Sequence, residues 1–287
     1  MKNESKRKSC DLHTHSRYSD GTYTPRELLE AADNIGLSAV VLCDHNTVSG
    51  LDEFVREGEN FCAEAVPGIE LSTEWRGKEL HIIGLYINPS HYDKINDLVD
   101  EMRREKTESY RKCVESLNRA GYNIDYEQLM AATDCGINRA HIARELLRLG
   151  YVDSVKEAFS GLISKAGGHY TAPKYISSLD AIRFLKSIGA VAVWAHPYLS
   201  LDANQVREFL PLFKEAGLDA METVYPTYDE QTTKLARETA LEFGILESGG
   251  SDFHGPVKPG IELGVGRGNL FVPSEFHLKL KDKLKQI

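Results

Sequence analysis

Short apolar runs in this chain are repeatedly followed by an imidazole or a carboxylate. Ala39-Val40-Val41-Leu42-Cys43 leads to His45, and Val191-Ala192-Val193-Trp194 leads to His196. Neither run alternates with polar residues, which predicts strands that are buried on both faces of a mainly parallel sheet. In barrels of alternating strands and helices, active sites lie at the carboxyl ends of the strands. The pattern therefore indicates an α/β barrel with polar side chains gathered at one end.

Nine candidate metal ligands occur in such motifs. They are six histidines, two aspartates and one glutamate, namely His13, His15, Asp20, His45, Glu70, His81, His196, Asp252 and His254. Residues i and i+2 of a strand point to the same face, so His13 and His15 can bind one ion together. Asp252 and His254 can do the same from a second strand. Because burying so many ionisable groups without metal ions would be prohibitively unfavourable, we expect a site for several ions.

The motifs that carry these residues resemble those of the PHP (polymerase and histidinol phosphatase) superfamily. Among them are Asp11-Leu12-His13-Thr14-His15, Asp44-His45-Asn46 and Gly250-Ser251-Asp252-Phe253-His254. The whole series follows the order of the superfamily and covers nearly the whole chain. More narrowly, the chain resembles metal-dependent phosphoesterases that include nucleotide 3',5'-bisphosphate phosphatases and AMP phosphatases. The resemblance implies a distorted (β/α)7 barrel with a helical insertion.

Carried over motif by motif, the resemblance implies two or three divalent metal ions. The first would be bound by His13, His15, Glu70 and Asp252. The second would share Glu70 and add His81 and His196, and the third would be bound by Asp20, His45 and His254. Mixed imidazole and carboxylate ligation suits manganese, iron or zinc, of which we favour manganese. Asp11 and Asp44 are expected either to orient imidazoles or to cap strand ends.

The alternation of strands and helices is interrupted after Ile87-Asn88-Pro89. Helical charge pairing without a strand signal follows, with short helices predicted at 125–132, 138–149 and 153–159, and the alternation returns at Ser178. We therefore predict two parts, a catalytic barrel formed by residues 1–91 and 176–287 and a helical cap formed by residues 92–175. A purely structural helical insertion is the alternative.

The insertion contains Asn138-Arg139-Ala140-His141, which is similar to an Arg-x-His segment that these phosphoesterases use at the substrate. The resemblance implies that Arg139 holds a phosphate outside the metal site. It also implies that His141 hydrogen-bonds the reacting phosphate or protonates the leaving alkoxide. A surface ion pair is the alternative for Arg139. The match is looser over residues 162–170 and at Asn46, where the family often has Asp, and these departures concern the substrate more than the metal chemistry.

Composition and charge restrict the kinds of partner that the chain is expected to bind. The 287-residue chain has a formal net charge of -9, which argues against binding long nucleic acid by general attraction of phosphates. The amino terminus lacks the apolar segment of a signal peptide, no stretch approaches a membrane span, and the five cysteines contain no Cys-x-x-Cys pair. We expect a cytoplasmic enzyme with reduced thiols and no obligate protein partner.

Together these features predict a metal-dependent phosphomonoesterase that acts on a small phosphorylated metabolite. A nucleoside 3',5'-bisphosphate or a nucleoside monophosphate is the favoured substrate. The first alternative is a phosphodiesterase that opens a cyclic sugar phosphate or shortens oligonucleotides as an exonuclease. The second is a metal-binding regulatory module without turnover, which the complete ligand set disfavours. No Gly-x-Ser-x-Gly motif supports serine hydrolase chemistry.

Overall fold

The chain divides into two compact units. The computed structural model describes residues 8–131, 137, 139–164 and 166–286. The first unit comprises Met1–Asn96 and Ile176–Ile287, and the second comprises Asp97–Tyr175. Each unit contains a hydrophobic core cluster of its own. The roles predicted for the two parts, catalysis and capping, remain proposals.

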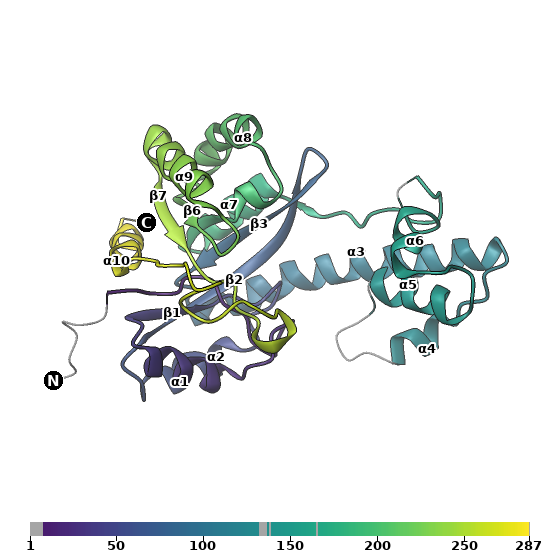
Figure 1. Ribbon diagram of the computed structural model, residues 1–287, viewed down its shortest axis with the longest axis horizontal. Helices are drawn as coiled ribbons and strands as arrows, with labels where there is room; N and C mark the ends of the chain where they lie inside the picture. Colours follow the sequence, from purple (N-terminus) through teal and green to yellow (C-terminus); the bar gives the residue numbers. More distant parts are fainter. Residues whose placement is uncertain (1–7, 132–136, 138, 165, 287) are drawn as a thin grey trace. The chain divides into compact units, whose positions relative to one another are not determined.

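A curled, seven-stranded mixed sheet forms the centre of the first unit (Figure 1). Its strands are β1 (Ala39–Leu42), β2 (Glu64–Trp75), β3 (Lys78–Leu85), β4 (Ile176–Ser177), β5 (Val191–Ala195), β6 (Ala220–Val224) and β7 (Leu246–Gly249). The order across the sheet is β1-β2-β3-β5-β6-β7, and β4 pairs with β2. β3 is antiparallel to both β2 and β5, whereas the remaining pairs are parallel. The two strands predicted from apolar runs correspond to β1 and β5.

Residues 10–15 lie between the two edge strands and close the sheet. The amide of Asp11 donates a hydrogen bond to the carbonyl of Ala39 at the start of β1. The amide of Leu12 donates to the carbonyl of Gly249 at the end of β7. This segment completes the distorted barrel by isolated bridges, without forming a regular strand.

Helices cover the outside of this sheet. They are α1 (Pro25–Ile35), α2 (Leu51–Gly58), α7 (Ser178–Ser187), α8 (Ala203–Ala216), α9 (Glu230–Phe243) and α10 (Ser274–Leu284), with the short 3-10 helices η2 (Pro89–His91), η3 (Pro197–Leu199) and η4 (Gly255–Val257). α1 packs on β1, α2 on β2, α7 on β3 and β5, α9 on β6, and α10 on β7. The interior is filled by side chains such as Val41, Ile83 and Val193. A polar site therefore has room only at an end of the barrel.

The regular elements described within the second unit are helices. α3 (Tyr92–Arg119) begins in the first unit and continues into the second, followed by α4 (Tyr126–Ala131), α5 (Arg139–Arg148) and α6 (Val155–Ser160). Their core includes Tyr110, Leu117, Ile142, Leu146 and Ile163. The last three helices correspond to those predicted from the sequence. No helix among the described residues of either unit is long and apolar enough to cross a membrane.

Candidate metal centre

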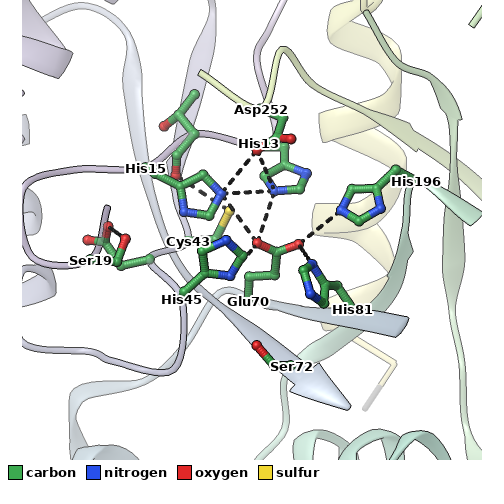
Figure 2. A network of polar contacts seen from close by, with 12 residues as sticks. His13, His15, Ser19, Cys43, His45, Glu70, Ser72, His81, His196 and Asp252 are labelled. Atoms are coloured by element: carbon green, nitrogen blue, oxygen red, sulfur yellow. Dashed lines mark hydrogen bonds and ion pairs between the residues drawn. The ribbon is translucent and has the colours of Figure 1, made fainter. Parts of the chain in front are cut away.

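All nine predicted ligands meet at one end of the barrel. Seven of them are labelled in Figure 2, where the carboxylate of Glu70 lies at the centre of the group. His13, His15 and Asp20 precede α1, His45 follows β1, His196 follows β5, and Asp252 and His254 follow β7. The remaining two, Glu70 and His81, belong to β2 and β3.

The expectation that most ligands lie at strand ends is wrong for Glu70 and His81. Both lie inside a long antiparallel hairpin, because β2 and β3 have 12 and 8 residues whereas β1 has only 4. Glu70 forms a bridge with His45, just beyond the end of β1. Since β3 is antiparallel to β5, His81 near its start pairs with Ala195 at the end of β5. The hairpin thus brings two mid-strand residues level with the ligands at strand ends.

Four ligand atoms form the first group. The Nε2 atoms of His13 and His15 are 3.1 Å apart. Glu70 Oε2 lies 3.4 Å from the first and 3.3 Å from the second, and Asp252 Oδ1 lies 3.5 and 3.3 Å from them. Four atoms bound to one ion at about 2.0–2.2 Å in a tetrahedron are roughly 3.3–3.6 Å apart. The observed spacings are close to those that a single ion requires.

The second oxygen of Glu70 faces a different group. Glu70 Oε1 lies 2.8 Å from His81 Nδ1 and 3.2 Å from His196 Nε2. In Figure 2, His81 and His196 accordingly lie on one side of the carboxylate and His15 on the other. This is the arrangement of a carboxylate that can bridge two ions.

A third group surrounds Asp20. Asp20 Oδ1 lies 3.2 Å from His254 Nε2 and 3.9 Å from His15 Nδ1, and Asp20 Oδ2 lies 3.9 Å from His45 Nε2. The spacing allows His254 and Asp252 to bind one ion together, but His254 Nε2 faces Asp20 whereas Asp252 Oδ1 faces the first group, which is the division that the resemblance implies. The reason is local, because β7 ends at Gly249 and Asp252 has a left-handed φ of 52°.

The donor set fits divalent metal ions. His15 Nδ1, His45 Nδ1 and Glu70 Oε2 are buried without a hydrogen-bond partner among the described residues. Leaving a buried polar atom unpaired costs about 1–3 kcal/mol, and more for a charged group. His45 Nδ1 and Glu70 Oε2 are nevertheless only 2.9 Å apart. A cation bound to the first group would satisfy Glu70 Oε2.

Glu222 is a site residue that the sequence motifs did not indicate. It is fully buried on β6, and its Oε1 lies 2.9 Å from His13 Nδ1. Its Oε2 accepts a hydrogen bond of 2.7 Å from the amide of His196. With its Nδ1 proton directed to Glu222, His13 presents the Nε2 lone pair to the first group, as a metal-binding histidine requires. The only signal in the sequence is a glutamate within the apolar run Ala220–Val224.

Asp11 and Asp44 cap backbone segments and do not orient imidazoles. Asp11 accepts hydrogen bonds from the amides of Ser251 and Gly264, each at 2.8 Å. Asp44 accepts from the amide and hydroxyl of Ser16, at 2.8 and 2.6 Å. Of the two roles left open by the sequence, capping is the one that these contacts show. Both aspartates hold the loops on which the ligands lie.

The outer oxygen of Asp252 is held from two sides. The hydroxyl of Tyr225 donates to Asp252 Oδ2 at 2.6 Å, and the ammonium group of Lys258 forms an ion pair with the same oxygen. Asp252 and His196 both have positive φ, which is uncommon outside glycine and costs about 1–3 kcal/mol per residue. The fold thus maintains strained backbone where two ligands enter the site.

Electrostatic coupling keeps the carboxylates of the centre ionised. Burial alone would raise the pKa of Glu70, but His45 and the neighbouring imidazoles hold that pKa well below its ordinary value. The pKa of Asp252 is lowered in the same way against the effect of burial. Burial would lower the pKa of His13, but Glu222 and Glu70 raise it well above its ordinary value. The positive charge of the imidazoles therefore stabilises the buried carboxylates, and a bound cation would replace that charge.

Arg139 and His141 belong to the second unit. Both lie in the first turn of α5, which carries no acidic residue. Arg139 forms no ion pair with a carboxylate among the described residues, so the surface ion pair considered for it is absent there. Burial and then the charge of Arg144 lower the pKa of His141. Asn138 of the same segment lies outside the described residues.

Residues 11–173 match the PHP domain family. The chain belongs to this family. The predicted family, fold class and activity are thereby confirmed, since the protein is a metal-dependent phosphoester hydrolase with a PHP-type barrel.

Relatives of this PHP protein act on several phosphoesters. The chain is 31% identical to a 5'-3' exoribonuclease from Haemophilus influenzae, over 90% of this chain and 93% of that protein. It is 28% identical to a 3',5'-nucleoside bisphosphate phosphatase from Chromobacterium violaceum, over 89% and 90%. It is 30% identical to a phosphoribosyl 1,2-cyclic phosphate 1,2-diphosphodiesterase from Eggerthella lenta, over 85% and 94%. A solved structure from Bifidobacterium adolescentis, assigned as a metal-dependent phosphoesterase, has a TM-score of 0.74 at 26% identity, with 96% of each chain covered.

Proposed function

We propose that this PHP protein removes a phosphate from a nucleotide and that two or three divalent ions bind at the barrel end. The favoured substrate is a nucleoside 3',5'-bisphosphate or a nucleoside monophosphate. Manganese is favoured, with iron or zinc as alternatives. The observation that carries the proposal is Glu70, whose two oxygens face separate groups of imidazoles. A carboxylate in this position can hold two ions side by side.

The proposed ligand sets follow the three groups. His13, His15, Glu70 and Asp252 would hold the first ion, Glu70, His81 and His196 the second, and Asp20, His45 and His254 the third. When bound, divalent ions neutralise charge on phosphoryl oxygens and lower the pKa of a nucleophilic water. Glu222 fixes the tautomer of His13, and Tyr225 and Lys258 leave Asp252 Oδ1 directed at the site. The barrel residues therefore prearrange the ligands before an ion or substrate arrives.

Arg139 and His141 are proposed to act on the substrate. Arg139 has no carboxylate partner among residues 139–164 and the other described parts of the chain, and an arginine can bind a phosphate through two parallel hydrogen bonds. Burial and the charge of Arg144 lower the pKa of His141, which favours its neutral imidazole. His141 would hydrogen-bond the reacting phosphate or protonate the leaving alkoxide.

A 5'-3' exoribonuclease is the second candidate, because a relative with that activity covers nearly the whole chain. The two activities share a geometry. A nucleoside 3',5'-bisphosphate and a 5'-phosphorylated oligoribonucleotide both carry a 5'-phosphate next to an esterified 3'-phosphate. If Arg139 holds the 5'-phosphate, cleavage of the bond to the 3'-oxygen releases inorganic phosphate from the first and a shortened chain from the second. The net charge of -9 favours short oligonucleotides over long ones.

One substrate screen tests these proposals. The manganese-loaded protein would be offered adenosine 3',5'-bisphosphate, adenosine monophosphate, a cyclic sugar phosphate and short oligoribonucleotides with a 5'-phosphate or a 5'-hydroxyl. Release of inorganic phosphate from the first two supports the phosphatase. Shortening of only the 5'-phosphorylated oligonucleotide supports the exonuclease, and opening of the cyclic ester supports the remaining alternative. If none of these compounds is hydrolysed, the proposed substrate class is wrong.

A further inference from the structure

Arg139 lies against two aromatic rings of the second unit. Its guanidinium carbon is 4.6 Å from the centroid of the Tyr170 ring and 5.3 Å from that of Phe159. Both distances are within the range of about 6 Å at which a cation is attracted to the face of a ring. These contacts join the start of α5 to the end of α6 and to the segment that follows α6.

The Tyr170 ring is itself held in place. It is buried, with 6% of its surface exposed, and it stacks on Tyr110 of α3 with ring centroids 6.4 Å apart. The hydroxyl of Ser109, next to Tyr110, donates a hydrogen bond of 2.5 Å to the carbonyl of Thr171. α3 thus anchors the backbone and the ring of this segment. Arg139 therefore rests on a ring that is buried and packed against α3.

We propose that Tyr170, with a smaller contribution from Phe159, is a positioning residue that holds Arg139 ready to bind the remote phosphate of the substrate. This inference rests on the proposed function of Arg139. Tyr170 belongs to residues 162–170, where the sequence departs from the pattern of the resembling phosphoesterases. The inference assigns a role to one residue of that segment.

Aromatic rings suit this task better than a carboxylate does. A carboxylate partner would neutralise the guanidinium and occupy the hydrogen-bond donors that a phosphate needs. A ring attracts the guanidinium through its face and leaves the N–H groups in the guanidinium plane available. The rings also restrict the rotamers of Arg139 before the substrate binds. Less side-chain entropy is then lost on binding, which improves affinity.

The test compares Tyr170→Leu, which removes the ring, with Tyr170→Phe, which keeps it. Steady-state kinetics of the manganese-loaded full chain would be measured with adenosine 3',5'-bisphosphate and with p-nitrophenyl phosphate, which has no second phosphate. We expect Tyr170→Leu to raise KM for the bisphosphate about three- to thirtyfold, with kcat and the kinetics on p-nitrophenyl phosphate unchanged. Tyr170→Phe should behave like the wild type. Phe159→Leu should give a smaller increase in KM, and it serves as the second variant if Tyr170→Leu does not fold.

Tyr151→Leu is the matched control. Tyr151 packs on Tyr122 in the same unit, with ring centroids 5.1 Å apart, and removal of its ring should leave KM unchanged. An equal rise in KM for this variant would mean that loss of packing is the cause, and the inference would fail. In the double variant Arg139→Ala/Tyr170→Leu, the loss should equal that of Arg139→Ala alone, whereas additive losses would show that Tyr170 acts independently.

The same measurements separate the inference from the proposed function. If Arg139→Ala weakens bisphosphate binding but Tyr170→Leu and Phe159→Leu do not, only the positioning role is wrong. If Arg139→Ala itself leaves KM for the bisphosphate unchanged, the role of Arg139 is wrong and the inference falls with it.

Discussion

The barrel end and the start of α5 hold their charged groups in different ways. In the barrel, each of the nine predicted ligands has an atom within 3.3 Å of an atom of another ligand. In the insertion, Arg139 rests on the faces of Tyr170 and Phe159. The first arrangement leaves buried atoms such as His15 Nδ1 and Glu70 Oε2 without hydrogen-bond partners among the described residues, and bound cations would satisfy such atoms. The second holds a cation on ring faces, with no carboxylate partner among the described residues. We propose that the first region receives metal ions and the second an anion.

The largest effect is expected where the two ions would share a ligand. Glu70→Gln replaces a carboxylate by a neutral amide, so bound metal should fall by the equivalent of both shared ions. Replacing a residue that hydrogen-bonds a metal ligand typically lowers activity roughly 10- to 100-fold. Replacing the ligand itself should lower activity by more. Elemental analysis and phosphate release would be measured, with Glu79→Gln on the exposed part of β3 as control. Full metal content and activity in Glu70→Gln would show that the proposed centre is wrong.

Glu222→Gln tests the residue that contacts His13 Nδ1. The carbonyl oxygen of Gln can still accept from the amide of His196, but its NH2 group cannot accept the Nδ1 proton of His13, and the charge that stabilises the imidazole is lost. We expect metal affinity or activity to fall about 10- to 100-fold. Glu247→Gln on the neighbouring strand β7, where Glu247 contacts Thr223, provides the control. Titration with manganese should show weaker binding only for Glu222→Gln, and unchanged binding would remove Glu222 from the centre.

Arg139→Ala should discriminate between substrates. Loss of a charge-assisted bidentate contact costs roughly 1.5–3 kcal/mol, or about ten- to a hundredfold in kcat/KM. The loss should be large for a 3',5'-bisphosphate and small for p-nitrophenyl phosphate, with metal content unchanged. An equal loss for both compounds would place Arg139 at the reacting phosphate. In that case the proposed division, in which the barrel end binds metal ions and the start of α5 binds a remote phosphate, would be wrong.

The smallest effect concerns Glu64, which lies on the same strand as Glu70 but away from the centre. A hydrogen bond from His277 and, further, the charge of Lys281 lower the pKa of Glu64 to about 2. A lowered folded-state pKa stabilises the protein above the unfolded-state pKa of about 4.3, and this stabilisation is lost as the pH falls towards 2. Because the side chain is 40% exposed, we expect Glu64→Gln to cost less than about 1 kcal/mol at pH 7.

Urea denaturation of the metal-free protein at several pH values would check this. The difference in the free energy of unfolding between wild type and Glu64→Gln should shrink from pH 7 to pH 3. A difference that does not depend on pH would mean that the carboxylate charge of Glu64 does not stabilise the fold. Metal binding should be equal in the two proteins, in contrast to Glu70→Gln.

Much of the fold was predictable because its signals are local. The apolar runs 39–43 and 191–194 correspond to β1 and β5, and Thr24-Pro25 and Gly36 bracket α1, where Thr24 accepts a hydrogen bond from the amide of Glu27. The direction of β3 does not follow from the apolar runs but from Arg76-Gly77, a two-residue turn with positive φ at both positions that can join β2 and β3 only as an antiparallel hairpin. That direction is what places His81 beside His196.

The sequence by itself determined the kinds of ligand, their spacing and the family, because imidazoles and carboxylates after apolar runs are visible without any knowledge of packing. Only the tertiary structure decided which of them face one another. Glu222 shows the difference, since a glutamate in an apolar strand gains meaning only when His13 lies 2.9 Å away across 209 residues of sequence. Arg139 shows it again, because its contacts with Tyr170 and Phe159 depend on how α3, α5 and α6 pack. The physical reason is that the choice of ligand type is a local property, whereas burial, pairing and pKa depend on distances that only the folded chain sets.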